Sequence, residues 1–340
     1  MSMITEQPLT EATETSWAKI ISKYRTPSRA LSWWQIANSF IPYIILWGLM
    51  VWSLSFSYWL TLLLMLPAAG FTIRLFIIFH DCGHGSFFKS QKLSDLVGYF
   101  IGVLTFTPYA HWHHAHQIHH RTAGNLDKRG VGDVWTLTVN EYKALPWKKK
   151  LFYRLYRNPL LMFGLGPALV FFISNRFTFK GYSRQERFSV YLTNLGIFTI
   201  ALVLCLTIGW KAYVLIQFPM MYLAAVAGVY LFYVQHQYDE VYWTDDKNWD
   251  FKLVALQGCS FFKLPKVLQW FTGNIGFHHI HHLSFKIPNY YLEACHNESP
   301  VFKQIKPITF FKSFRTLRLR LWNEETRRLV SFRSLKPNYS

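Results

Sequence analysis

Histidine, the side chain that most often binds metals in proteins, is concentrated in three short stretches of this 340-residue sequence. The densest stretch runs HWHHAHQIHH, and in it His116, His119 and His120 stand at positions i, i+3 and i+4. Side chains with this spacing project from one face of a helix, so the three imidazoles can converge on one object. The stretch therefore predicts a helix that presents nitrogen ligands.

The other two stretches repeat the helical spacing. HDCGH places His80 and His84 at i and i+4, and HHIHH places His278, His281 and His282 at i, i+3 and i+4. These eight imidazoles exceed the needs of one zinc ion, which takes about four ligands. We therefore predict two metal ions, and neutral imidazole suits iron, zinc, copper and nickel.

A ninth ligand and supporting carboxylates are expected beside these stretches. His236 follows the last long apolar run, where the chain returns to the side of the other histidines. An imidazole ligand usually donates its second ring N–H to a carboxylate or carbonyl, and carboxylates would also offset the charge of the metals. The candidates for this supporting role are Asp81, Asp127, Asp133, Asp239, Glu240 and Glu293.

The remaining histidines are interpreted as surface or hydrogen-bonded core residues, because a histidine off the shared helix face has many other roles. They are His111, His113, His114, His279 and His296. His296 ends the sequence Glu293-Ala-Cys-His296, which matches the Glu-x-x-His motif of soluble di-iron bundles. Such bundles need two of these motifs on facing helices, and the sequence has one.

The composition is that of a membrane protein. The chain is 51% hydrophobic and 19% aromatic and carries a formal net charge of +18. A charge of this size can indicate nucleic-acid binding, but here the basic residues flank long apolar runs, as in membrane proteins. We therefore expect no nucleic-acid partner. The four cysteines form no C-x-x-C motif and indicate neither a zinc ribbon nor a disulfide framework.

Four apolar runs approach the roughly 20 residues that a membrane helix needs. They pair into two hairpins, with spans at about 41–56 and 59–79 and at about 190–208 and 212–234. The first turn carries no charge and the second is short, whereas the segments around the histidines are rich in arginine and lysine. Since basic segments remain in the cytosol, we predict a multi-pass plasma-membrane protein with its active site and both termini on the cytosolic side.

Two shorter apolar runs, 96–108 and 159–174, are interpreted as interfacial helices. A crossing at 96–108 would place His84 and His116 on opposite sides of the membrane, which a shared site does not allow. Another short interfacial helix is expected at 32–40, with Trp33 and Trp34 at the level of the headgroups. The first 30 residues have no apolar core, so we expect no cleavable signal peptide.

The expected fold is an all-α integral membrane protein with one domain over residues 1–340. The first hairpin, 41–79, is followed by a cytosolic or interfacial segment, 80–187, that holds the first two histidine stretches. The second hairpin, 190–234, leads into a cytosolic helical cap, 235–340, that holds the third stretch and a basic tail. This order brings all three stretches to one side of the membrane.

The three stretches resemble the three histidine boxes of the membrane fatty acyl desaturases. The sequence GNIGF at 273–277 leads into the third box, and IPNY at 287–290 follows it, as in that family. The resemblance covers about residues 40–295. The segment NLDKRGVGDVW at 125–135 is most similar to the acyl-lipid delta-5 desaturases of bacilli.

The resemblance implies a di-iron centre that introduces a cis double bond into the acyl chain of a membrane phospholipid or a thioester, with O2 as co-substrate. Its iron ligands would be His80, His84, His116, His119, His120, His278, His281 and His282. His236 matches an additional ligand, while Phe232 stands where some acyl-CoA members have an asparagine. The first 30 residues are too short for a cytochrome b5 domain, so a ferredoxin or flavodoxin is expected to supply electrons.

Two alternatives remain open at this point. A di-iron hydroxylase acting on a lipid or alkyl substrate would share the histidine spacing, and only its product would differ. A histidine-rich metal transporter or sensor belongs to another class. Transporters place ionisable ligands inside their membrane spans, whereas here the histidines follow the ends of the apolar runs.

Overall fold

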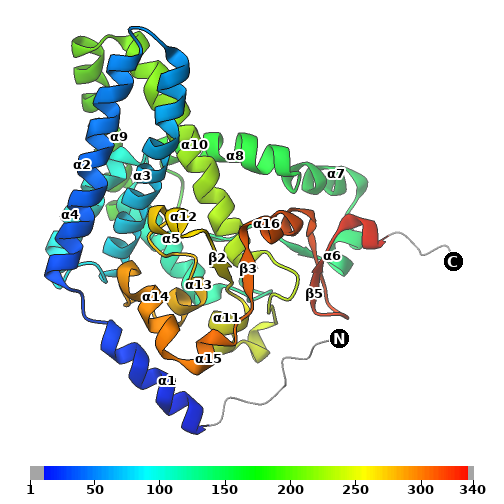
Figure 1. Ribbon diagram of the computed structural model, residues 1–340. Helices are drawn as coiled ribbons and strands as arrows, with labels where there is room; N and C mark the ends of the chain where they lie inside the picture. The colour runs from blue at the N-terminus through cyan, green and yellow to red at the C-terminus, as the bar shows by residue number, and fades with distance from the viewer. Residues whose placement is uncertain (1–10, 336–340) are drawn as a thin grey trace.

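The structure is a computed structural model that describes residues 11–335. It consists mostly of helices, which form a tall bundle above a broader body (Figure 1). Four helices are long and apolar enough to cross a membrane, and they are α2 (Arg29–Ser53), α3 (Tyr58–His84), α9 (Arg184–Thr207) and α10 (Trp210–His236). They confirm the two predicted hairpins. The predicted cytosolic termini lie outside the described residues.

Helix α2 corrects one expectation. No separate interfacial helix forms at 32–40, because α2 continues from Arg29 through Pro42 to Ser53. Its first turns are held by the body of the protein: the Ser32 hydroxyl donates to the carbonyl of Phe87 at 2.6 Å. This tertiary contact extends the helix beyond the apolar run that the sequence displays.

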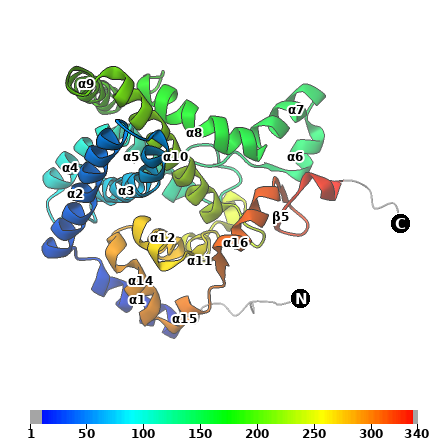
Figure 2. The same ribbon diagram turned by 45° about the horizontal axis from the view of Figure 1, so that its top comes forward.

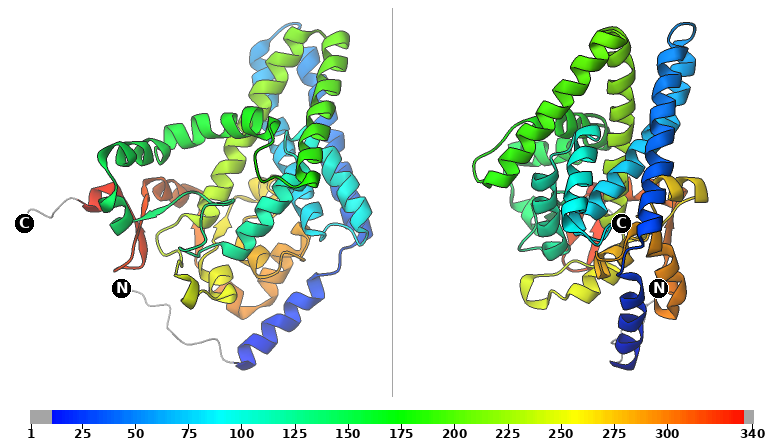
Figure 3. Two further views of the ribbon diagram at one scale, coloured as in Figure 1. Left: turned by 180° about the vertical axis from the view of Figure 1, so that it is seen from behind. Right: turned by 90° about the vertical axis from the view of Figure 1, so that its left-hand side faces the viewer.

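The two shorter apolar runs behave differently from the four spans. Helix α4 (Gln91–Leu104) has 14 residues, fewer than a span needs, and packs against α3 and α9. The Leu160–Arg176 segment, which includes α8 (Gly166–Ala168), meets α7 (Trp147–Tyr156) at 58°. Figures 1 and 3 show that this segment runs across the bundle. An interfacial position for both runs remains our prediction.

The body is assembled from short elements far apart in sequence. Its helices include α1 (Glu11–Tyr24), α5 (Tyr109–Thr122), α6 (Val139–Ala144), α11 (Phe251–Gln257), α12 (Lys266–Phe271), α13 (His278–Leu283), α14 (Asn289–Glu298), α15 (Pro300–Lys303) and α16 (Phe310–Ser313). Helices α13 and α11 lie below the lower end of α10 (Figure 1), and Figure 2 shows the same region with the top of the molecule turned forward. The third histidine stretch is thereby brought below the spans.

Five short strands add to the helical fold that was expected. Strand β4 (Leu321–Asn323) pairs in parallel with β1 (Leu137–Thr138) and antiparallel with β5 (Arg328–Val330). Strand β2 (Phe261–Lys263) pairs in parallel with β3 (Pro307–Thr309). The pairings fasten the C-terminal part of the chain to the segments that follow the second histidine stretch and α10.

Arg157 connects the same segments by hydrogen bonds in the protein interior. The side chain is fully buried and donates to the carbonyl of Leu319 at 3.1 Å and to the Gln237 side chain at 2.8 Å. Hydrogen bonds from its two terminal nitrogens offset the cost of burying the cation, while its Nε has no partner among the described residues. Arg157 therefore joins the end of α7 to the chain that follows α10 and to the C-terminal segment.

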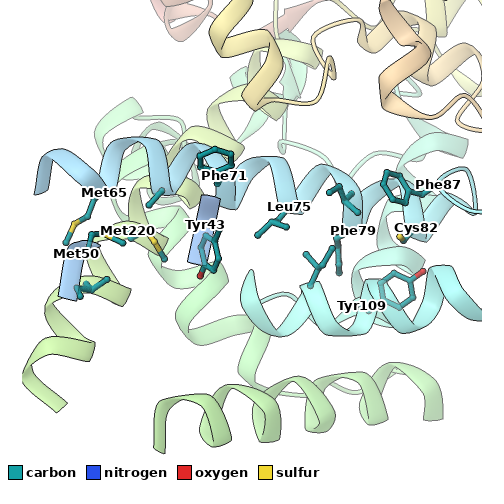
Figure 4. Close-up of a cluster of buried hydrophobic side chains, with 14 of the residues drawn as sticks. Tyr43, Met50, Met65, Phe71, Leu75, Phe79, Cys82, Phe87, Tyr109 and Met220 are labelled. Atoms are coloured by element: carbon teal, nitrogen blue, oxygen red, sulfur yellow. The ribbon is translucent and has the colours of Figure 1, made fainter. Parts of the chain in front are cut away.

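The main apolar core follows helix α3. Side chains from α2, α5 and α10 pack along it, and Figure 4 shows Met50, Met65, Leu75, Phe79 and Met220 along its length. The same core continues to the level of the first histidine stretch. The packing that holds the spans together therefore also fixes the height at which α3 ends.

Gly98 on α4 marks a close approach to α5. A Cβ at this position would lie 2.2 Å from a ring carbon of Tyr109, at the start of the helix with the second histidine stretch. We expect Gly98→Ala to destabilise the protein by about 1–3 kcal/mol through overpacking. Thermal unfolding in detergent measures this. Gly48→Ala is the matched control, because a Cβ there meets no atom within 4 Å; equal melting temperatures for the two variants would contradict the prediction.

Candidate metal centre

Two parallel membrane helices deliver histidines at their lower ends. His80 and His84 lie in the last turns of α3, which ends where Gly85 takes a left-handed conformation with φ of 60°. His236 is the last residue of α10. The turns that join the spans lie at the opposite end of the bundle (Figure 1). Both helix ends therefore bring imidazoles to the same level of the molecule.

The structure gathers all nine predicted ligands into two compact groups. The first group consists of His80, His84, His116, His120 and His281, and the second of His119, His236, His278 and His282. Within each group the nitrogens that face one another all lie within 4.8 Å. Every one of these side chains is buried. The groups adjoin, since the rings of His120 and His282 stack at a centroid distance of 4.1 Å.

Helices α5 and α13, which carry the second and third histidine stretches, each contribute to both groups. On α5, His116 and His120 belong to the first group while His119 belongs to the second. On α13, His281 belongs to the first group while His278 and His282 belong to the second. The histidines of each of these helices therefore project from a shared face, as the spacing predicted, and that face lies between the two groups.

The nitrogens within each group face one another at contact distance. In the first group, the Nε2 of His120 lies 3.1 Å from that of His116 and 3.0 Å from that of His281. In the second group, the Nε2 of His236 lies 3.1 Å from that of His119 and 2.9 Å from that of His278. A neutral imidazole has one N–H and one lone pair, so each of these Nε2 atoms offers a lone pair when its N–H lies on Nδ1.

The chemistry of this nitrogen set fits metal ions. Burial lowers the pKa of five of these imidazoles well below the usual histidine range, and neighbouring imidazoles lower it further; the five are His116, His120, His278, His281 and His282. These rings are therefore neutral and keep their lone pairs. His84 in the first group and His282 in the second each have a buried Nε2 without a hydrogen-bond partner. Converging lone pairs in a dry site are suited to a cation.

Two of the predicted carboxylates lie against ligand imidazoles. Asp81 Oδ1 is 2.9 Å from His80 Nδ1, and Asp133 Oδ1 is 2.5 Å from His119 Nδ1. An Nδ1–H that donates to a carboxylate leaves the Nε2 lone pair directed at the group. One carboxylate therefore supports each group.

The other predicted carboxylates are engaged elsewhere. Asp127 accepts from the backbone N–H of Asp246 at 2.9 Å, and Glu293 pairs with Lys266. Glu240 lies 3.7 Å from Arg328 at an exposed position, and Asp239 is exposed as well. In the part of the chain that the structure describes, none of the four contacts a ligand histidine.

The five histidines that were not predicted as ligands lie outside both groups. His111 and His114 each place Nδ1 about 3 Å from Glu186 Oε1, at 3.1 and 3.0 Å, so they fasten α5 to the start of α9. His113 contacts the Gln117 side chain at 2.7 Å. His279 Nε2 lies 3.0 Å from His296 Nδ1 in a separate buried pair.

Residues that support Asp81 escaped the sequence analysis. Asn289 donates to Asp81 Oδ2 from its backbone N–H at 2.7 Å and from its side chain at 2.9 Å. Gln35 on α2 donates in turn to the Asn289 side chain at 2.9 Å. The sequence offered one signal, the IPNY segment after the third stretch, but nothing that linked it to Asp81.

A largely apolar cavity of about 290 Å³ reaches the histidines. His80, His116 and His278 line one part of it, and side chains of α3 and α10 line its continuation as far as Thr72 and Met221. Residues of the Leu160–Arg176 segment complete the wall. The volume lies near the lower end of the range of small-ligand sites, roughly 300–1,000 Å³, and suits a slender apolar molecule.

Comparisons with known proteins agree with one another. The model of the fatty acid desaturase family matches residues 56–309. A fatty acid desaturase of Bacillus subtilis (strain 168) is 51% identical over 318 residues, which cover 94% of this chain and 90% of that protein.

More distant relatives carry more detailed names. An sn-1 acyl-lipid omega-3 desaturase (ferredoxin) of Nostoc sp. (strain 36) is 27% identical, with 73% of this chain and 69% of that protein covered. An endoplasmic-reticulum omega-3 fatty acid desaturase of Vigna radiata var. radiata is 30% identical, with 71% of this chain and 65% of that protein covered.

The two carboxylates lead to a prediction about metal affinity. We expect Asp81→Ala and Asp133→Ala each to weaken metal binding by about 10- to 100-fold, because the imidazole beside each loses its fixed orientation. Metal retained against a competing chelator measures the loss. Asp127→Ala removes a carboxylate that contacts no ligand and should bind metal as the wild type does. Equal affinity in all three variants would exclude the supporting role.

Proposed function

This chain belongs to the fatty acid desaturase family, and on that premise we propose that its two histidine groups bind two iron ions that serve the oxygen-dependent desaturation of a membrane lipid. The observation that carries the proposal is the pair of adjoining, buried histidine groups beside a largely apolar cavity. The proposed ligands are the nine histidines of the two groups. Imidazole suits iron among other metals, and the family membership selects iron.

Iron bound in these groups would supply, together with O2, the oxidising power needed to remove hydrogen from an unactivated methylene. The protein contributes position and isolation. Asp81 and Asp133 hold the tautomers of His80 and His119, while Trp112 and Phe232, two cavity residues, pack on ligand rings. This apolar cover keeps water from the reacting carbon atoms.

The cavity is the proposed site of the acyl chain. Along α10 its lining runs from Gln235 to Met221, a length of about 21 Å at 1.5 Å per residue. The histidines lie near the Gln235 end, so most of the depth is available to the tail of the chain beyond the reacting carbons. This asymmetry supports a double bond nearer the carboxyl end, as the resemblance to delta-5 desaturases implies, and we propose that position.

The substrate and the electron donor are proposed from the relatives. Several relatives are named as acyl-lipid or lipid-linked desaturases, and the names of some include ferredoxin. We propose a phospholipid acyl chain as the substrate and a ferredoxin, with flavodoxin as the other candidate, as the donor. The hydroxylase alternative is not favoured, because the family and its relatives are desaturases.

We propose that the end of the bundle with the histidine groups lies on the cytosolic side of the plasma membrane. The segments that adjoin the histidines carry many basic residues, whereas the turn at 54–57 between α2 and α3 carries none. This charge difference is the usual signature of cytosolic loops. We further propose that the chain acts as one domain, since the ligands come from positions between His80 and His282.

A first experiment tests the ligand set in a host that lacks its own desaturase. We expect His119→Ala to abolish unsaturated product and to lower the iron content of the purified protein, while membrane insertion is retained. His114→Ala should have a milder effect, because this exposed side chain contacts Glu186 and no ligand. Fatty acids are analysed by mass spectrometry and iron by elemental analysis. Complete loss in both variants would contradict the ligand assignment.

A second experiment tests the cavity. Gly228 lines it, and a Cβ there would meet no atom within 4 Å, so Gly228→Leu should fill the cavity without disturbing its surroundings. We expect desaturation of long chains to fall at least tenfold, with normal iron content. Gly48→Leu on exposed α2 surface is the matched control and should remain active. Unchanged desaturation of long chains by Gly228→Leu would mean that the acyl chain binds elsewhere.

A further inference from the structure

The metal groups are buried, so electrons must reach them through the residues that cover them. Among residues 11–335 and outside the ligand set, three aromatic side chains make ring contacts with ligand imidazoles. They are Trp112, Phe232 and Phe285. Trp112 and Phe232 line the acyl cavity, whereas Phe285 does not. Phe285 therefore covers the histidines on a side that the substrate leaves free.

Phe285 contacts two ligands of the first group. Its ring stacks on His84 at a centroid distance of 5.2 Å and lies 5.7 Å from His120. The ring is partly exposed. A molecule docked over Phe285 would thus be separated from two ligands of one metal by a single side chain.

The surroundings of Phe285 are basic. Lys286 follows it, and its ammonium group donates to the carbonyl of His84 at 2.7 Å. Burial and the nearby Arg25 lower the pKa of Lys286, which places a second cation close to it. Gln91, at the start of α4, and Lys286 both lie close to Gly85. The exposed Lys89 and Lys92 are close neighbours of Gln91 in the chain and add two further cations to this region.

Helix α5 adds a further cation. His113 lies close enough to Lys286 for that charge to lower its pKa. The exposed Arg121 follows His120, whose ring contacts Phe285. We call Phe285, Lys286, Arg25, Lys89, Lys92 and Arg121 the Phe285 surface. The acidic Asp95 nearby is occupied by Gln91 and Tyr109.

We propose that the Phe285 surface is the docking site of an acidic one-electron carrier protein, which delivers electrons to the first histidine group through His84 and His120. The inference rests on the proposed function. Each turnover takes two electrons from the carrier, two hydrogen atoms from the acyl chain and two protons from water, and O2 leaves as two molecules of water. Opposite charge around the docking site speeds encounter and fixes orientation.

The other partly exposed approach is less suited to such a carrier. Asp133 lies over His119 of the second group, with a side chain that is 12% exposed. Its carboxylate would repel an acidic protein at that point. Charge therefore favours the side of the first group.

Steady-state kinetics in zwitterionic lipid vesicles test the proposal, with a reduced [2Fe–2S] ferredoxin as the donor. In Lys92→Glu/Arg121→Glu, we expect the KM for ferredoxin to rise by roughly tenfold at low salt, and the difference to shrink as salt screens the charges. Turnover driven by dithionite with methyl viologen should remain at the wild-type rate, because neither side chain has a role in the site.

Lys149→Glu is the matched control. It reverses an exposed charge on α7, which lies on the other side of the molecule from α4 (Figures 1 and 2), and should leave the KM for ferredoxin unchanged. An unchanged KM in the double variant, or an equal rise in the control, would overturn the proposal. So would a loss that also appears with dithionite, or that depends on anionic lipid in place of the donor. A wild-type protein that forms no unsaturated product with either reductant would instead refute the proposed function.

Discussion

The structure depends on the close approach of nine buried imidazoles. Their nitrogens face one another at about 3 Å within two groups, for example 2.9 Å between His236 and His278. Lone pairs at that distance repel unless a cation or a shared proton lies between them, and burial disfavours protonation. The fold therefore gathers a set of nitrogens that is suited to hold a cation.

The membrane spans determine where this set can form. Helices α3 and α10 run in the same direction and end at the same level, so His84 and His236 reach the lower surface of the bundle together. The body then closes the site from below with α5 and α13. Because the cavity extends upward between the same two helices, one packing arrangement fixes both the metal groups and the path of an acyl chain.

The cavity and the Phe285 surface are chemically different approaches to the two histidine groups. The cavity is lined largely by apolar side chains, which include Trp112 and Phe232. The Phe285 surface is basic, and Phe285 does not line the cavity. A hydrophobic substrate and a charged electron donor can thus approach the same pair of groups without competing. The Asp81–Asn289–Gln35 chain of hydrogen bonds connects the first group to α2, the first helix of the bundle.

The sequence by itself determined the spans and the family and indicated the nine histidines that the structure brings together, because the helical spacing of histidines and the length of apolar runs are local properties. It also indicated two metals from the number of imidazoles. Only the tertiary structure decided how His116, His119 and His120 divide between two groups, which two of six carboxylates reach a ligand, and that α2 continues through Pro42. Those outcomes depend on contacts between residues far apart in the chain, and no periodicity within a single segment records them.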